Sequence, residues 1–346
     1  MSGNLLTYSG IVTKVKAMDR HLLNEADYTH ISTLETTAEF ITYLKKQPAY
    51  EQVFEHADEH ALHRSQIEEI LANPMYIAYE KIYRFCGIKQ RETLSLIFFR
   101  YEVNILKACL QRVFNKEQPY DLSLFEHFFS SHSKIKIAEL AASRTLDEFI
   151  THLKDTDYYP LFKELQNSNY ENLYDYEVQL DIYYFTKAWK LQRQLLNGAA
   201  LDSFSSVLGC QIDLLNIMWI YRSKKFYDID STKIYAHIIP INYKLSQEEL
   251  MKLIESHTLD DFTKTISSTY YHKVFPEFDA ATIEQNYYSM LNKVYQNNVR
   301  KYPLSMTPIQ YFLYQKEREL DRLTTALECI RYKLEPNEIL HYISLK

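Results

Sequence analysis

The chain has 346 residues, of which 46% are hydrophobic, and it carries a formal net charge of −6. That apolar fraction supports a sizeable core and argues against wholesale disorder, while the negative charge argues against a nucleic-acid binder, which needs a basic surface. Only 5 Gly and 9 Pro are present, too few for the frequent turns of a β-sandwich, so long helices are expected.

The N-terminal stretch lacks the unbroken apolar segment of a signal peptide, because Lys14, Lys16 and Asp19 interrupt it. The longest apolar runs, such as LLNIMWIY at 214–221, are much shorter than the ~20 residues that cross a bilayer. The four cysteines form no C-x-x-C pair, which favours a reducing compartment. The sequence therefore predicts a soluble chain that meets a membrane only through a partner or a surface patch.

One helix-start pattern occurs three times along the chain, in TAEFITYLKKQPAYEQVF (37–54), TLDEFITHLKDTDYYPLF (145–162) and TLDDFTKTISSTYYHKVF (258–275). In or just before each copy a Thr three residues ahead of an acid predicts a capping box, and a Phe then begins an apolar helical stripe. The pairs are Thr36 and Glu39, Thr145 and Glu148, and Thr258 and Asp261. A Tyr-x-x-x-Phe pair follows. The phenylalanines lie 109 and 113 residues apart and are predicted core positions: Phe40, Phe149 and Phe262.

A second series follows each Phe by 57 to 64 residues, in RYEVNILKACLQ (100–111), QIDLLNIMWIYR (211–222) and RELDRLTTALEC (318–329). Each copy places an acid four residues before a Leu or Ile; the acids are Glu102, Asp213 and Glu319. Recurrence at repeat positions indicates a structural role, such as capping a neighbouring helix or pairing with a basic side chain. The two series predict an all-α single domain of three repeats, about 1–125, 126–235 and 236–346, which can sit around a pseudo-threefold axis.

The segments between these copies also have helical periodicity, as in LDIYYFTKAWKLQRQLL (180–196). The exception is YAHIIPINYKLS (235–246), where Pro240 interrupts the pattern and predicts irregular chain. Further helix starts are predicted at LSQEEL (245–250) and LEPNEI (334–339).

Motifs for catalysis or cofactor binding are missing from the sequence: there is no phosphate-binding glycine loop and no nucleophile elbow. No cofactor is therefore expected. The stretch HADEHALH places His56, His60 and His63 at offsets that put them on one stripe of a helix, as a zinc site requires. No further ligand can be located, so we expect a solvated polar face and no metal.

The stretch YRSKK (221–225) is a small basic run that contains Arg222, Lys224 and Lys225. Cations at the end of a helix interact favourably with its C-terminal dipole, which is sufficient to explain the run. Contact with an acidic partner or a lipid head group is the alternative, and these three residues are the candidate interface.

At several of these segments the chain resembles the C subunit of bacterial and archaeal V/A-type rotary ATPases, the equivalent of the eukaryotic d subunit. The resemblance is carried in order by IVTKVKAMDRHLL, RYEVNILKACLQ, DLLNIMWIYRSKKFY, IIPINYKLS, TLDDFTKTISSTYY and PLSMTPIQYFLYQKERELDRL, and it covers nearly the whole chain. Ile105 and Arg322 stand where the family pattern has Asn, and Thr324 where it has Arg.

The resemblance implies a three-lobed helical funnel that is not an enzyme. It implies a central-stalk or rotor component that couples the D and F stalk proteins to the membrane proteolipid ring, during ATP-driven ion transport or ATP synthesis. It also implies a cytoplasmic location peripheral to the membrane, and a monomer when the protein is isolated. Two other hypotheses stay open at this point: an unrelated helical-repeat scaffold, and a metal-dependent enzyme at His56, His60 and His63.

Overall fold

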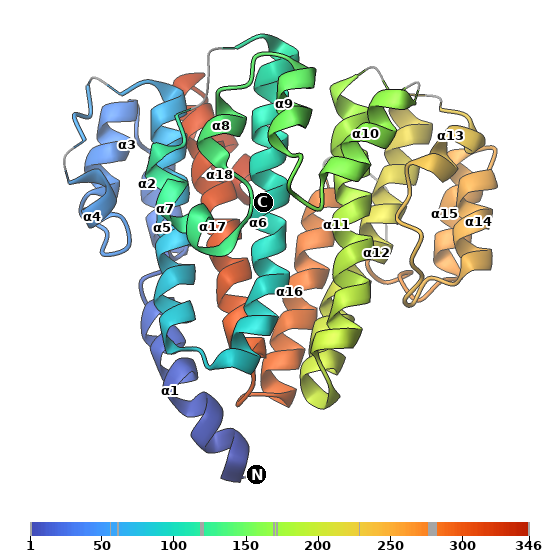
Figure 1. The fold of residues 1–346 in the computed structure, drawn as a ribbon, viewed down its shortest axis with the longest axis horizontal. Coiled ribbons are helices and arrows are strands. Elements are labelled where there is room, and N and C mark those ends of the chain that lie inside the picture. Colours follow the sequence, from blue (N-terminus) through green and yellow to red (C-terminus); the bar gives the residue numbers. More distant parts are fainter. Residues whose placement is uncertain are drawn as a thin grey trace. The chain divides into compact units, whose positions relative to one another are not determined.

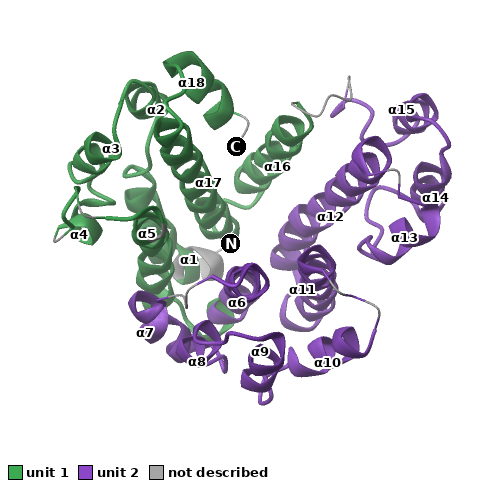
Figure 2. Cartoon of the chain, turned by 90° about the horizontal axis from the view of Figure 1, so that it is seen from above, with its two compact units in different colours: residues 1–90, 277–346 green, residues 91–276 purple. Residues whose placement is uncertain are grey.

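The computed structural model describes residues 2–55, 57–60, 62–117, 121–168, 170, 172–227, 229–275 and 282–344. Within these ranges the regular structure is helical and contains no strand, which confirms the predicted all-α class (Figure 1). The chain divides into two compact units, which Figure 2 colours separately: unit 1 combines residues 1–90 with 277–346, and unit 2 comprises residues 91–276.

Unit 1 is organised around the long helix α17. This helix packs against α1, α2, α3, α5, α16 and α18, so the last third of the sequence provides the centre of a unit whose other helices are mostly N-terminal. The helices of unit 1 are α1 (Ser2–Asp19), α2 (Glu25–Ser32), α3 (Thr37–Leu44), α4 (Glu51–Phe54), α5 (Arg64–Phe85), α16 (Ile283–Lys301), α17 (Thr307–Arg331) and α18 (Pro336–Ser344).

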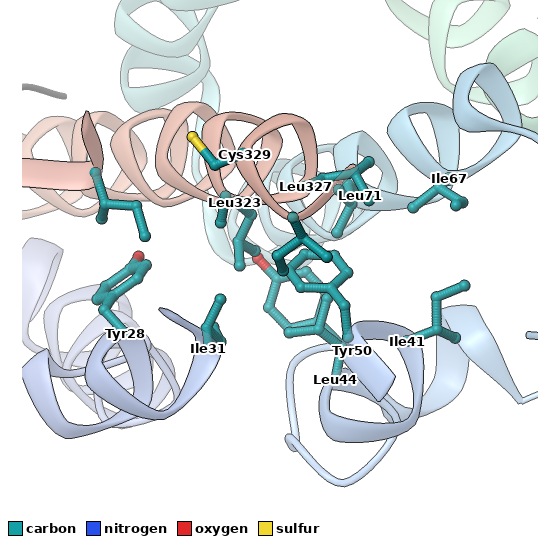
Figure 3. Close-up of a cluster of buried hydrophobic side chains, with 14 of the residues drawn as sticks. Tyr28, Ile31, Ile41, Leu44, Tyr50, Ile67, Leu71, Leu323, Leu327 and Cys329 are labelled. Carbon is teal, nitrogen blue, oxygen red and sulfur yellow. The ribbon is translucent and has the colours of Figure 1, made fainter. Parts of the chain in front are cut away.

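The core of unit 1 joins the first helix-start pattern to α17 (Figure 3). Phe40 and Leu44 of α3 and the ring of Tyr50 are almost fully removed from solvent, and Leu323 and Leu327 of α17 belong to the same cluster. These apolar positions recur every three or four residues, so each helix presents one buried stripe. The packing brings together segments almost 300 residues apart in the sequence.

Unit 2 contains a pair of long helices, α11 and α12, that pack side by side. Helix α12 also packs against α14 and α15, while α7, α8, α9 and α10 contact one another in sequence order. The helices of unit 2 are α6 (Ile88–Asn115, except its first three residues), α7 (Ser123–His132), α8 (Ile137–Ala141), α9 (Leu146–His152), α10 (Tyr159–Asn167), α11 (Leu173–Leu195), α12 (Gly198–Phe226), α13 (Ser231–Ala236), α14 (Gln247–Glu255) and α15 (Leu259–Ser267).

The three threonines of the repeated pattern are the N-caps of α3, α9 and α15. Each hydroxyl accepts the N–H of the acid three residues on, at 3.1 to 3.2 Å. The predicted return bond to the Thr N–H is wrong, however. The two glutamates are long enough to reach the N–H one residue earlier, and the shorter aspartate accepts the threonine hydroxyl. The pairs are Glu35–Glu39 (2.9 Å), Arg144–Glu148 (2.8 Å) and Thr258–Asp261 (2.8 Å).

Helix α12 is the one helix in the described ranges that is long and apolar enough to cross a membrane, which the short apolar runs in the sequence did not predict. Its most apolar window has a mean hydropathy of 1.2, and 78% of that window is buried inside the chain. The protein interior therefore accounts for the hydrophobic character of this helix.

Candidate functional site

Each of the three repeat acids accepts a hydrogen bond from a buried tyrosine of the Tyr-x-x-x-Phe pairs. In each case the acid lies on a long helix, and the tyrosine lies just after a threonine-capped short helix. The bonds are Tyr158 to Glu102 (2.9 Å), Tyr271 to Asp213 (2.9 Å) and Tyr50 to Glu319 (2.8 Å). In terms of the repeats predicted from the sequence, each acid bonds the tyrosine of the next predicted repeat, and the acid of the third bonds the tyrosine of the first.

The same acids also hold the chain that leads into a second short helix. Glu319 accepts the N–H of Leu23 at 2.6 Å, just before α2, and the ammonium of Lys316 at 2.5 Å. Glu102 accepts the hydroxyl of Ser133, whose oxygen in turn accepts the N–H of Ile135, just before α8. Each carboxylate therefore ties at least two short segments to one long helix.

Asp213 has the most complete set of donors and is only 1% exposed. Besides the Tyr271 hydroxyl, it accepts the backbone N–H groups of Tyr243 (3.2 Å), Lys244 (2.6 Å) and Leu245 (2.9 Å), which immediately precede α14. Burial raises the pKa of Asp213 above the ordinary aspartate value, and these hydrogen bonds act in the opposite direction by stabilising the charged form.

Burial likewise raises the pKa of Glu102, against the effect of its bonds from Ser133 and Tyr158. The tyrosines respond to burial in the same sense. Desolvation is the largest cause that raises the pKa of Tyr50, Tyr158 and Tyr271, and the neighbouring carboxylates raise it further. The hydroxyls therefore stay protonated and act as donors to the carboxylates.

The irregular segment before α14 is clamped along one face of α12. Asn216 donates to the carbonyl of Ile239 and accepts its N–H, both at 2.9 Å. Asp213 holds residues 243–245, as above. Gly209 lies one turn earlier, where a Cβ would be 2.4 Å from the ring of Tyr243. Residues 209, 213 and 216 share one helical face, so a single stripe of α12 holds the irregular segment at Ile239 and at residues 243–245.

The position three residues after each acid differs among the three sites. Asn216 holds the backbone of Ile239 in unit 2. In unit 1 Arg322 takes this position and donates to the carbonyl of Ile343 at 3.3 Å, so a longer side chain makes a comparable backbone contact. Ile105 instead is an apolar side chain, 5% exposed. Of the two departures from the family pattern, Arg322 thus keeps a polar contact with the backbone, whereas Ile105 is a buried apolar side chain.

Comparison with known proteins identifies the family of this chain. The family profile described as ATP synthase (C/AC39) subunit matches residues 11–342. The chain belongs to this family. Among curated relatives, the A-type ATP synthase C subunit of Methanosarcina acetivorans is 25% identical over 330 residues, covering 91% of this chain and 87% of that protein. The corresponding protein of Thermococcus kodakarensis is 24% identical over 344 residues, covering 97% and 90%.

The expected resemblance to the V/A-type C subunit is thereby confirmed. It concerns the whole chain and not one motif, because the profile begins within α1 and ends within α18. In this member of the C/AC39 family each of the three acids accepts a hydrogen bond from a tyrosine, and Asp213 and Glu319 also accept backbone N–H groups.

The candidate basic interface lies in the last two turns of α12, and its members have different environments. The Lys224 ammonium donates to the carbonyls of Ile254 (2.7 Å) and Ser256 (2.6 Å) at the C-terminal end of α14, and burial lowers its pKa. Lys225 is exposed, with its ammonium 5.9 Å from the centre of the Tyr221 ring. Arg222 is partly buried. Within the run, Lys225 is thus the most accessible cation, whereas Lys224 connects α12 to the end of α14.

The predicted histidine stripe is wrong where the structure describes it, and His56 lies outside the described residues. His60 is in a turn and His63 is the N-cap residue of α5, so these two do not share a helical face. Lys45 fixes this turn by donating to the carbonyl of Ala57 and to Glu59, both at 2.6 Å. Among the described residues no group of three His, Cys, Asp or Glu side chains is placed to hold a metal ion.

Proposed function

We propose that this chain is a non-catalytic central-stalk or rotor component of a V/A-type ATPase. In this role it couples the D and F stalk proteins to the membrane proteolipid ring. The observation that carries the proposal is the family match over residues 11–342, together with relatives named as the C subunit of A-type ATP synthases that align over about nine-tenths of both chains. The protein acts at the cytoplasmic side of the membrane, touches the membrane only through the ring, and is a monomer when isolated.

The architecture that we propose for this role is a funnel of three related helical units, at about residues 1–125, 126–235 and 236–346. Support comes from the three threonine caps, the three buried phenylalanines and the three tyrosine–carboxylate bonds. A protein that transmits torque needs stiff internal connections. Buried hydrogen bonds to a charged group resist deformation better than a solvated linker, because breaking them leaves an unpaired charge in the interior.

Transmission of torque requires no chemistry in this protein. The hydroxyl, ammonium and backbone donors on the three carboxylates support a structural role for these groups. We also propose that the chain binds no metal. Elemental analysis of protein purified without chelators tests this point, and about one zinc per chain that is lost when His56, His60 and His63 are all replaced by Ala would overturn it.

Binding to isolated partners tests the proposal. The purified chain is mixed separately with the D and F stalk proteins, with detergent-solubilised proteolipid ring, and with protein-free anionic liposomes. We expect retention by the stalk and by the ring, and little by liposomes, since a net charge of −6 disfavours adhesion to anionic lipid. Retention by liposomes alone would contradict the adaptor role and indicate a peripheral lipid-binding protein.

The basic run provides a variant for the same assay. We propose Arg222, Lys224 and Lys225 as part of one partner contact. Lys225→Ala is the informative change because this side chain is exposed and its loss leaves the packing of α12 intact. Weaker retention by one partner only, with an unchanged melting curve, supports the contact. Equal retention of the variant and the wild type by both partners rejects Lys225 as part of it.

A further inference from the structure

A polar cavity of about 500 Å³ lies within unit 1, beside the Glu319 carboxylate. It is lined by the start of α2, by α16 and α17, and by the end of α18. Tyrosine, amide and arginine side chains dominate its wall, including Gln285, Asn292 and Gln315. Its volume is within the range of small-molecule sites, about 300–1,000 Å³, and its lining is suited to a polar ligand.

Two arginines of α17 line this cavity one helical turn apart, so they share one face. The guanidinium carbon of Arg318 lies 3.6 Å from the centre of the Tyr288 ring, and that of Arg322 lies 4.0 Å from the centre of the Tyr28 ring. Stacking on an aromatic face fixes the plane of a guanidinium and leaves its N–H edge for hydrogen bonding.

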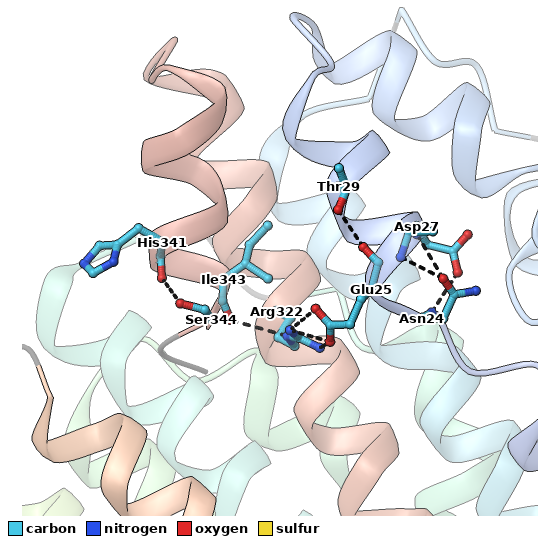
Figure 4. Close-up of polar contacts among 9 residues, drawn as sticks. Asn24, Glu25, Asp27, Thr29, Arg322, His341, Ile343 and Ser344 are labelled. Atoms are coloured by element: carbon cyan, nitrogen blue, oxygen red, sulfur yellow. Dashed lines mark hydrogen bonds and ion pairs between the residues drawn. The ribbon is translucent and has the colours of Figure 1, made fainter.

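Arg318 has unused hydrogen-bonding capacity. Its Nη1 atom is buried and has no hydrogen-bond partner in the described part of the chain. A buried donor without an acceptor is costly, and a charged one more so, which makes a bound acceptor the natural complement. Arg322, by contrast, bonds the carbonyl of Ile343 and the carboxylate of Glu25, as Figure 4 shows.

The two carboxylates that line the cavity, Glu25 and Glu319, are each already paired with a cation. Glu319 is fully engaged by Leu23, Tyr50 and Lys316. Glu25 pairs with Arg322 at 3.2 Å, but its side chain is 84% exposed. Exposed ion pairs contribute little, so Glu25 is readily displaced by a better acceptor. An oxyanion in the cavity would thus meet two oriented guanidinium groups and one replaceable carboxylate.

We propose that this cavity binds a phosphate-bearing small molecule, with its phosphate group held by Arg318 and Arg322 in place of Glu25. Guanidinium groups match phosphate oxygens with paired N–H donors, and the amides of α16 and α17 serve the polar remainder of the ligand. This site goes beyond the coupling role, which requires no small-molecule ligand.

Isothermal titration calorimetry of the full chain tests the proposal, with inorganic phosphate, adenosine monophosphate and uncharged adenosine as the probes. We expect saturable binding of the two phosphates and none of adenosine. Tighter binding of the monophosphate than of inorganic phosphate would identify a phosphate ester as the preferred class, and equal binding would identify the free anion. Absence of saturable binding for both phosphates overturns the proposal.

Three variants make the test specific. Arg318→Gln should weaken phosphate binding about tenfold or more, as expected for a lost charged hydrogen bond. Glu25→Gln should strengthen it by removing the competing carboxylate. Arg331→Gln, on the same helix and outside the cavity, should leave it unchanged. Equal affinities in all three, each folded by circular dichroism, would show nonspecific anion binding and overturn the site. Glu25→Gln keeps the test valid if Arg318→Gln fails to fold. The Glu25 side chain is exposed, so its replacement should not disturb the fold, and the variant should gain affinity for phosphate.

Discussion

Removal of the Tyr271 hydroxyl tests the carboxylate sites most directly. Its ring is fully buried, and the hydroxyl donates to Oδ2 of Asp213 at 2.9 Å. Tyr271→Phe removes one oxygen and keeps the ring, so the packing around it changes little. The neighbouring Tyr270 provides the control, because it is 56% exposed and Tyr270→Phe removes the same atom from a solvated position.

The expected cost of Tyr271→Phe at neutral pH is about 1.5–3 kcal/mol, the range for a hydrogen bond to a charged group. Three backbone donors remain on Asp213, so the carboxylate is not stripped of partners and the larger penalties for an isolated buried charge do not apply. Tyr270→Phe should change stability by less than about 0.5 kcal/mol, as for other surface substitutions.

The pH dependence follows from the raised pKa of Asp213. Between the ordinary aspartate value of 3.8 and the higher folded value, the native state holds more protons than the unfolded state, so this group makes stability fall as the pH rises. Loss of the Tyr271 donor raises the pKa of Asp213 in the folded state further, so the pH range over which stability falls extends to higher pH. The loss of folding free energy in Tyr271→Phe should therefore be largest at neutral pH and become smaller as the pH approaches 3.8.

Guanidinium denaturation followed by circular dichroism measures this deficit at a series of pH values for the wild type and both variants. A cost below about 0.5 kcal/mol at neutral pH would show that the hydroxyl contributes no more than a solvated one. A full cost that does not vary with pH would show that lost packing, and not the bond to a carboxylate, is responsible. Either result refutes the assignment of Tyr271 as a donor to a charged Asp213.

Further substitutions test other parts of the fold and of the basic run. Phe149→Ala should cost about 3–5 kcal/mol in a denaturant melt, because the ring is fully buried; a cost below about 1 kcal/mol would contradict that burial. Gly209→Ala should cost about 1–3 kcal/mol, because its methyl group would displace the ring packed there, whereas Gly10→Ala, with open space around it, should be neutral or stabilising. Lys224→Met should lower the melting temperature by removing donors from two carbonyls, and Lys225→Ala should not; equal melting temperatures would show that the Lys224 bonds are dispensable.

The all-helical class and the starts of the repeated helices could be predicted from sequence because they depend on local patterns. A threonine three residues before an acid, followed by an apolar stripe, carries its own cap and its own buried face. The irregular segment around Pro240 was predicted for the same reason. The family resemblance was also visible, since ordered motifs extend along nearly the whole chain.

The partners of the recurring acids could not be predicted, because repeat spacing shows which residues are equivalent and not which ones touch. Tyr50 and Glu319 are 269 residues apart, and only the tertiary fold brings them together. A local signal was available in α12, where Gly209, Asp213 and Asn216 fall on one helical face. Their spacing could have identified the clamp on the irregular segment that follows.

The prediction that the histidines share a helical stripe was wrong for a local reason that spacing alone does not reveal. Offsets of four and seven residues place side chains on one face only if the backbone is helical throughout. Here α4 ends at Phe54, and Asp58 accepts the N–H of His60 at 3.0 Å, which stabilises a turn. Lys45 holds the same turn from α3's C-terminal end.

Coupling is the central claim of this account, and ATP-driven ion transport in a reconstituted ATPase complex measures it most directly. Complexes are assembled in liposomes with and without this chain, and ATP hydrolysis is recorded in parallel with ion uptake. We predict that omission of the chain leaves hydrolysis by the head but abolishes uptake, and that adding the purified chain restores uptake. Equal uptake in the two preparations would contradict the coupling role.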